Sequence, residues 1–132
     1  AIIRTCSCLG ADIEIIKPCG FLLTDKRFKR VVMDYMDFDR VKFYESSEDF
    51  FRIKRKSRVI LMTTKAKNIY TNFQFEENDT ILFGKESGGV PEKVHRSLKY
   101  KLRVPMVEKK RSLNLSTSVA ITISEWVRQI NG

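Results

Sequence analysis

The sequence predicts an α/β fold, with a mostly parallel sheet that carries helices on both faces. Short apolar segments at residues 58–62, 80–83 and 101–104 are typical of buried strands. Segments with helical spacing lie between and after them, so strands and helices alternate along the chain. This alternation is typical of parallel sheets, whose crossover connections are helices.

The chain has 132 residues, of which 42% are hydrophobic. That is enough for one domain with a real core, and we expect a single domain over residues 1–132. No apolar run approaches the roughly 20 residues that span a bilayer, so no membrane partner is predicted. Residues 1–9 are too short and too polar for a signal peptide.

The first half of the chain contains the least regular patterns. Residues 1–9 are expected to form a helix that ends at Gly10, because glycine is the usual residue after a helix. The alternating residues 12–16 and the short segment 41–44 are predicted strands. Residues 26–33 have helical spacing and are predicted to form a basic helix between those two strands.

Three further helices are predicted from their capping residues. Ser47 is expected to cap a helix whose first turn is acidic, which suits the helix dipole. Residues 91–98 are a second helix, with proline in its first turn. Residues 114–130 form the longest helix, and its apolar stripe is expected to face the core. The stripe consists of Leu115, Val119, Ile123 and Trp126.

The charge balance is strongly basic, with 25 Lys and Arg against 16 Asp and Glu, a net charge of +9. A densely negative partner follows naturally, and nucleic acid is the first candidate. A merely soluble basic protein would show the same balance. The basic run at residues 52–58 has two interpretations as well: a solvated helix end with its loop, or a contact with phosphate.

The cysteines argue against disulfides and against a metal site. Cys6, Cys8 and Cys19 are odd in number and irregularly spaced, which favours a reducing, cytoplasmic location. The single histidine, His95, lies far along the chain from these thiols. Three thiols and one imidazole could form a zinc site on paper, but the usual ligand spacing is missing, so no metal is predicted.

Two segments far apart in the sequence are the strongest functional signal. Residues 81–91 run from an apolar strand into a loop of glycine and polar residues, and residues 104–116 run from a strand to Asn114, at the start of the longest helix. Two such loops side by side would form a cleft lined by backbone groups, which suits a small polar cofactor. Taken singly, the glycines could mark a tight turn and nothing more.

Several common chemistries do not fit these segments. The glycine loop is neither a P-loop nor a Gly-x-Gly-x-x-Gly motif, so ATP hydrolysis and hydride transfer lack their usual phosphate site. A Ser–His–Asp or Cys–His arrangement is not credible either, because His95 lies outside every glycine loop.

The two segments together resemble a known family. Phe83-Gly-Lys-Glu-Ser-Gly-Gly-Val-Pro91 resembles the second motif of the SPOUT superfamily of RNA methyltransferases. Val104-Pro-Met106 through Arg111-Ser-Leu-Asn-Leu-Ser116 resembles its third motif, and Ile2-Ile-Arg4 resembles the end of its first. Pro18-Cys-Gly-Phe21 is similar to the branch of small tRNA wobble-nucleotide 2′-O-methyltransferases that lack an added RNA-binding domain. The resemblance covers essentially the whole chain.

The resemblance implies a fold, a reaction and partners. The family fold is α/β with a C-terminal trefoil knot, an exception to the rule that chains are unknotted. The reaction is methyl transfer from S-adenosylmethionine to the ribose 2′-hydroxyl of the wobble cytidine or uridine in tRNA, without a metal. Family members are homodimers. A non-catalytic RNA-binding module of the same fold, and a SPOUT enzyme acting on ribosomal RNA or on a base, remain as alternatives.

The resemblance also implies site residues. Arg4 is expected at the reaction centre, where it would position the hydroxyl and stabilise the forming alkoxide, since arginine stays protonated and is a poor base. Glu86 is assigned to loop architecture or substrate positioning, and Asn114 to capping the last helix beside the pocket. The positions matching the cofactor loops are Met62, Gly84, Val104, Met106, Ser112 and Leu113. At Gly84, a Cβ would block close approach of the backbone to the cofactor.

RNA binding is expected to combine basic residues from two protomers. The candidates are Lys26, Arg27, Lys29, Arg30, Lys109, Lys110 and Arg111. In the family, a first strand precedes the residues that match Ile2–Arg4. The domain is therefore expected to lack that strand here.

Overall fold

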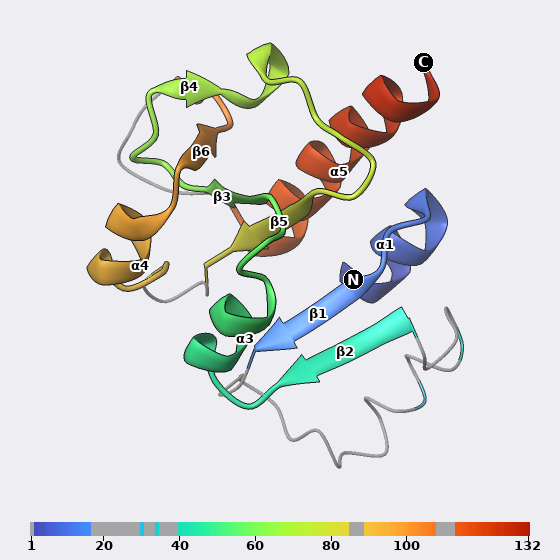
Figure 1. The fold of residues 1–132 in the computed structure, drawn as a ribbon. Helices are drawn as coiled ribbons and strands as arrows, with labels where there is room; N and C mark the ends of the chain where they lie inside the picture. Colours follow the sequence, from blue (N-terminus) through green and yellow to red (C-terminus); the bar gives the residue numbers. More distant parts are fainter. Residues whose placement is uncertain (1, 17–29, 31–33, 35–39, 85–88, 108–112) are drawn as a thin grey trace. The chain divides into compact units, whose positions relative to one another are not determined.

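A computed structural model describes residues 2–16, 30, 34, 40–84, 89–107 and 113–132 (Figure 1). The chain forms two compact units, Ala1–Lys56 and Ser57–Gly132. Every strand pair that the structure describes is parallel, and both units contain helices as well as strands. The predicted α/β class with parallel strands is confirmed. The single domain stays a prediction.

In the first unit, α1 (Ile2–Leu9) is followed by β1 (Ile13–Ile16). The helix ends as predicted at Gly10, whose φ of 76° lies in the left-handed region that glycine adopts without strain. The N–H of Ala11 donates to the carbonyl of Cys6 at 2.9 Å, which satisfies one of the last carbonyls of the helix. β1 pairs in parallel with β2 (Val41–Tyr44), confirming both predicted strands.

A serine caps α3 (Ser47–Ile53), but it is one residue earlier than predicted. The side chain of Ser46 accepts a hydrogen bond from the Asp49 N–H at 3.1 Å, and Ser47 is the first residue of the helix. Two adjacent serines offer the same capping chemistry, so the sequence did not distinguish them. The predicted basic helix at residues 26–33 lies outside the described residues, apart from the exposed Arg30.

The second unit carries the larger sheet, with strand order β4-β6-β3-β5. β3 is central and pairs in parallel with β5 on one side and β6 on the other. The elements are β3 (Val59–Met62), β4 (Asn68–Ile69), η2 (Tyr70–Asn72), β5 (Thr80–Phe83), α4 (Glu92–Ser97), β6 (Tyr100–Arg103) and α5 (Leu115–Asn131).

Most elements of this unit were predicted to within a residue or two. β6 is displaced by one position, so Val104 lies in the loop rather than in the strand. α4 is shorter than the predicted range 91–98 because Pro91 is its cap. β4 and η2 were not predicted, since segments of two or three residues are too short to show a period.

The core of the second unit is built around Ile60, Phe75 and Leu102, each at most 4% exposed. The apolar stripe predicted for α5 is partly confirmed. Val119 and Ile123 are buried, whereas the other two members are half-buried. Trp126 packs against the core cluster, and Leu115 lines a cavity at the start of α5.

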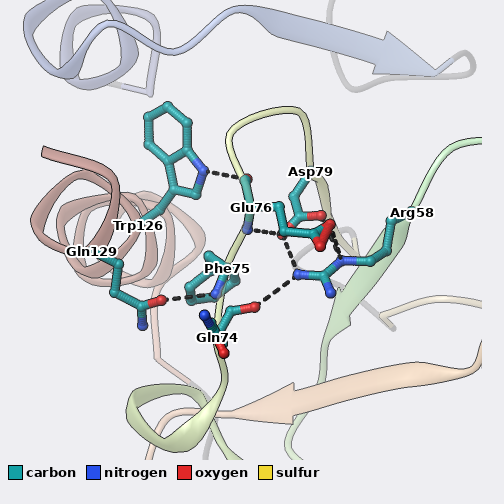
Figure 2. A network of polar contacts seen from close by, with 7 residues as sticks. All are labelled: Arg58, Gln74, Phe75, Glu76, Asp79, Trp126 and Gln129. Atoms are coloured by element: carbon teal, nitrogen blue, oxygen red, sulfur yellow. Dashed lines mark hydrogen bonds and ion pairs between the residues drawn. The ribbon is translucent and has the colours of Figure 1, made fainter.

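A polar network holds the segment before β5 against β3 and α5 (Figure 2). Arg58 donates two hydrogen bonds to the Asp79 carboxylate, at 2.6 and 2.7 Å. From α5, the indole N–H of Trp126 donates to the Glu76 carbonyl at 3.0 Å. Gln129 accepts from the Phe75 N–H at 2.8 Å. These contacts fix where β5 begins, and hence where its far end meets the loop of the site.

The same network includes Arg58, the last residue of the basic run at residues 52–58. The guanidinium of Arg58 lies over the rings of Phe73 and Tyr100, at 4.8 and 5.2 Å from their centroids. The hydrogen bond to Asp79 raises the pKa of Arg58. Arg58 therefore stabilises the fold, a role that neither interpretation of the run had proposed. Arg52, in contrast, pairs with Asp49 at an exposed position.

We expect Asp79→Asn to lower the free energy of unfolding by about 2–3 kcal/mol. The Asp79 side chain is 1% exposed, and its replacement removes the closest charge partner of Arg58. The guanidinium keeps Glu76 at 3.5 Å and the Gln74 carbonyl at 2.9 Å, which places the cost below that of breaking a fully buried pair. Urea unfolding followed by the fluorescence of Trp126, the single tryptophan, measures this. Asp49→Asn removes an exposed pair and should cost less than about 0.5 kcal/mol. Equal losses in both variants would contradict the prediction.

Candidate cofactor-binding site

The loops that build the site begin at one edge of the larger sheet. Because β3, β5 and β6 are parallel neighbours, their carboxyl ends lie side by side. The chain leaves these strands at Thr63, Gly84 and Val104 respectively. The Thr63 N–H donates to the Leu102 carbonyl at 2.8 Å, so the first loop stays attached to β6 as it leaves the strand. Crevices at this edge are where open α/β sheets bind ligands.

A cavity of about 520 Å³ opens between these loops and the start of α5, within the second unit. Its volume lies in the range of small-molecule sites. The described residues that line it are Leu61, Met62, Thr63, Thr64, Lys65, Phe83, Gly84, Gly89, Val90, His95, Val104, Met106, Leu113, Asn114, Leu115 and Ser118. The predicted meeting of the two distant loops in one cleft is therefore observed.

All five of the predicted cofactor residues that the structure describes line this one cavity. They are Met62, Gly84, Val104, Met106 and Leu113, together with Asn114 from the predicted catalytic set. Ser112 and Glu86 lie outside the described residues. Arg4 is exposed on α1 in the first unit, and its place in the site stays a prediction. Of the predicted RNA-binding residues, only Arg30 is described, and it is exposed; Lys26, Arg27, Lys29, Lys109, Lys110 and Arg111 lie outside the described residues.

The structure gives a physical reason for the glycine at position 84. A Cβ there would lie 2.5 Å from the Cα of Gly89 and 2.9 Å from the backbone nitrogen of Val90. Real Cβ atoms do not come this close to backbone, so the two ends of the loop can meet only if residue 84 is glycine. This constraint comes from loop closure at the cavity wall. The expected approach of the cofactor to Gly84 is a separate prediction.

Asn114 begins α5 at the cavity, as predicted. Its side-chain oxygen accepts from the Ser116 N–H at 2.8 Å, and its carbonyl accepts from the Ser118 N–H at 2.9 Å. The cap fixes the first turn of the helix, which contributes Leu115 and Ser118 to the wall. Asn114 therefore combines capping with a position in the site, and its direct role toward a ligand stays a prediction.

A polar wall of the cavity was not predicted from the sequence. It is formed by Thr63, Thr64 and Lys65 after β3, and by His95 on α4. His95 Nε2 lies 3.3 Å from Thr63 Oγ1, which also accepts from the Lys65 N–H at 3.2 Å. The position of residues 63–65 at the carboxyl end of a central strand was an available signal. The sequence argued only against a Ser–His–Asp or Cys–His arrangement and did not place His95 at the cavity, to which α4 brings it.

The charges along the wall have one sign. Among the described lining residues there is no aspartate or glutamate, and the charged or titratable ones are Lys65 and His95. Lys65 Nζ lies 3.6 Å from Glu92 at an exposed position outside the lining. Most of the other described lining residues have apolar side chains, and the exceptions are the two glycines, the two threonines, Asn114 and Ser118. Such a cavity can hold an aromatic ring against apolar side chains and an anionic group near the cationic side.

Other kinds of site receive no support in the part of the chain that the structure describes. No group of three or more His, Cys, Asp and Glu side chains there is placed to hold a metal ion. Cys6 is buried and Cys8 is exposed, both as free thiols. None of the described helices is long and apolar enough to cross a membrane.

The sequence pattern of the SpoU rRNA Methylase family matches residues 1–124. The chain belongs to this family. A tRNA (cytidine(34)-2′-O)-methyltransferase from Beijerinckia indica subsp. indica is 38% identical over 131 residues, covering 98% of this chain and 82% of the relative. The enzyme of the same name from Escherichia coli (strain K12) is 34% identical, covering 98% and 83%. The predicted resemblance to RNA methyltransferases is thereby confirmed.

Solved structures of SpoU methyltransferases share the fold. A structure determined to study 2-OH methylation of C/U34 on tRNA has a TM-score of 0.87 and 33% identity, covering 99% of this chain and 86% of its own. AviRb from Streptomyces viridochromogenes, solved in complex with AdoMet, has a TM-score of 0.76 at 22% identity, covering 99% and 55%. The second comparison supports the fold alone.

Removal of the α5 cap should separate stability from binding. We expect Asn114→Ala and Ser46→Ala each to cost about 1 kcal/mol of stability, since each removes a side-chain cap. Only Asn114→Ala should also weaken binding of S-adenosylhomocysteine, because only Asn114 lines the cavity. Calorimetric titration of both variants measures the difference. Equal affinities in the two variants would remove Asn114 from the site.

Proposed function

We propose that this protein transfers a methyl group from S-adenosylmethionine to the ribose 2′-hydroxyl of the wobble nucleotide, cytidine or uridine, in tRNA. The observation that carries the proposal is the cavity at the ends of β3, β5 and β6 in a chain of this family. Its residues include five of the six that resemble the family's cofactor positions. The names of the relatives that match 98% of the chain support tRNA as the substrate and position 34 as the target.

The cavity suits the proposed cofactor. Apolar side chains such as Met62 and Met106 can flank the adenine ring, and we assign recognition of its edge to backbone groups at Met62, Val104 and Met106. Ser112 and Leu113 complete this set in the proposal, with Gly84 shaping the loop opposite. The bound cofactor supplies an activated methyl group and its own leaving group, so no metal is required. The protein contributes binding and alignment of the hydroxyl with the methyl group.

The nucleophile needs help that a cofactor pocket alone does not give. A 2′-hydroxyl is a weak nucleophile, and negative charge develops on its oxygen as the methyl group moves. We assign to Arg4 the positioning of this hydroxyl and the stabilisation of the developing charge, because a guanidinium stays protonated. Glu86 is assigned to the loop or to substrate positioning. Asn114 holds the first turn of α5, beside the reacting groups.

The tRNA surface in this proposal is basic and comes from two copies of the chain. A homodimer would combine the predicted basic residues, Arg30 among them, and the excess of 25 Lys and Arg over 16 Asp and Glu supports a polyanionic partner. The C-terminal trefoil knot and a cytoplasmic location belong to the same proposal. Free cysteines at positions 6 and 8 are compatible with a reducing compartment.

Gly84→Ala tests the cavity itself. The added Cβ would collide with the backbone at Gly89, so we expect calorimetric titration with S-adenosylhomocysteine to show at least a ten-fold loss of affinity, about 1.4 kcal/mol. Gly10→Ala is the matched control. It places a Cβ in open space at a positive φ in the first unit, so it should cost about 1 kcal/mol of stability and leave affinity unchanged. Normal binding by Gly84→Ala would place the cofactor elsewhere.

Arg4→Ala tests the proposed reaction centre. Turnover of tRNA, followed by transfer of a labelled methyl group, should fall by about 100-fold or more, because a charge-stabilising donor is lost. Affinity for S-adenosylhomocysteine should stay within about two-fold, a difference below about 0.5 kcal/mol. Arg96→Ala, which removes an exposed arginine outside the cavity lining, is the comparison and should leave turnover nearly unchanged. An equal loss of binding and turnover in Arg4→Ala would remove this residue from the chemical step.

The substrate class can be tested by identifying which RNA accepts the methyl group. The name of the matching family refers to rRNA. The relatives from Beijerinckia indica and Escherichia coli, in contrast, are named for 2′-O-methylation of cytidine 34 in tRNA. Labelled methyl transfer to bulk tRNA, followed by nuclease mapping to position 34, would support the proposal. Transfer to ribosomal RNA alone would overturn the tRNA assignment. Tight tRNA binding without S-adenosylhomocysteine binding would favour the non-catalytic module.

A further inference from the structure

His95 is a titratable side chain in the cavity wall that the proposed chemistry does not use. It is the single histidine of the chain. α4 presents it to the cavity, and its Nε2 lies 3.3 Å from the hydroxyl of Thr63 in the loop after β3. Histidine is the side-chain type that ordinarily changes charge between pH 5 and 8. Among the described lining residues, His95 is therefore the one whose charge can vary in this pH range.

No opposite charge is present on the described cavity wall to cancel that change. The β5 and β6 loops contribute Phe83, Gly84, Val104 and Met106, and α5 contributes Asn114, Leu115 and Ser118, all neutral. The loop after β3 contributes Lys65, whose Nζ lies 3.6 Å from Glu92, one turn before His95 on α4. Arg96, next to His95, is exposed and lies outside the lining. Protonated His95 would thus add a positive charge to a wall on which the described lining residues include no carboxylate.

The two proposed ligands differ in charge by one unit at sulfur. S-adenosylmethionine carries a sulfonium cation, whereas S-adenosylhomocysteine has a neutral thioether, and the rest of the two molecules is the same. A positive charge on the wall therefore acts differently on the two ligands only through the sulfonium. Its interaction with the shared carboxylate and amine cancels when the two affinities are divided.

We propose that His95 sets the preference of the cavity between the cationic cofactor and its neutral product. Protonated His95 repels the sulfonium and shifts the preference toward the product; neutral His95 removes that repulsion. His95 acts here as a specificity-determining residue of the cofactor site and takes no part in the methyl transfer itself. This inference rests on the proposed function, because it requires both ligands to bind in the cavity.

The size of the effect follows from the dimensions of the cavity. A sphere with the volume of the cavity, about 520 Å³, is roughly 10 Å across, so a bound sulfur lies within about that distance of the wall. One unit charge at this distance changes the affinity ratio by about two- to fifteen-fold, for effective dielectric constants from about 80 down to about 20. An effect of this size is measurable by calorimetry.

The first experiment compares wild type with His95→Gln. The glutamine amide can still bond the Thr63 hydroxyl but cannot become charged. Dissociation constants of both ligands are measured at about pH 8 and about pH 5.5. The ratio of the cofactor's constant to the product's should rise about two- to fifteen-fold more in wild type than in His95→Gln on acidification. Ionisation of the ligands themselves is common to both proteins and cancels in this comparison.

Arg96→Gln is the matched control for charge on α4. It removes an exposed cation next to His95 that does not line the cavity, so the pH dependence of the ratio should match wild type. Lys65→Gln removes a lining charge that does not titrate in this range. It should lower the ratio at both pH values and leave the pH dependence in place.

A second measurement keeps the test valid if the glutamine variant folds poorly. Because the chain has a single histidine, its ring proton signals can be followed in wild-type protein by NMR without overlap. Reciprocity requires that the imidazole titrates at lower pH with the cofactor bound than with the product bound. The expected separation between the midpoints is about 0.3 to 1.2 pH units, the logarithm of the affinity change given above.

The outcomes separate this inference from the proposed function. Binding of both ligands with the stated difference between wild type and His95→Gln supports the role of His95. Binding of both ligands with equal pH dependence in the two proteins, or equal imidazole midpoints in the two complexes, overturns it and leaves the proposed function intact. Absence of saturable binding by either ligand overturns the proposed function together with the inference.

Discussion

The cavity depends on the parallel pairing of β3 with β5 on one side and β6 on the other. Parallel strands direct all three carboxyl ends to the same edge, so three loops that are distant in sequence begin side by side. An antiparallel neighbour on either side would send one of these loops to the opposite edge. The network around Arg58 and Asp79 supports the pairing, because it fixes the segment that enters β5 against β3 and α5 (Figure 2).

Two local features convert the shared edge into a cavity with a defined wall. Gly84 allows the chain after β5 to pass against the backbone of Gly89, an approach that no side chain permits. Asn114 starts α5 at the point where the last loop ends, so the first turn of the helix faces the cavity. Both residues shape the course of the backbone, Gly84 by the absence of a side chain and Asn114 by capping the helix. On the described part of the wall the charged or titratable side chains are Lys65 and His95, so this part of the wall responds to the charge of a ligand.

The sequence predicted most of the described cofactor residues of the site, and the residues that it missed were missed for physical reasons. Strands and the longest helix were predictable because their apolar periods extend over four or more residues, and the loops were recognisable because glycine and asparagine have narrow conformational roles. The α3 cap was displaced to Ser46 because adjacent serines are chemically equivalent. Thr63 was missed although it directly follows a predicted strand, and His95 was missed because nothing in its local pattern distinguishes it. Their meeting depends on the packing of α4 against the loop after β3.

The sequence by itself determined the fold class, the extents of most elements and the family, since these depend on local periods and on short motifs with fixed spacing. The tertiary structure alone decided which residues share a wall. It assigned Arg58 to a structural ion pair and brought His95 into the cavity, and it showed that the glycine at position 84 is required by a neighbouring glycine. These facts depend on contacts between segments 5 to 32 positions apart, and a local pattern carries no information about which distant atoms it will meet.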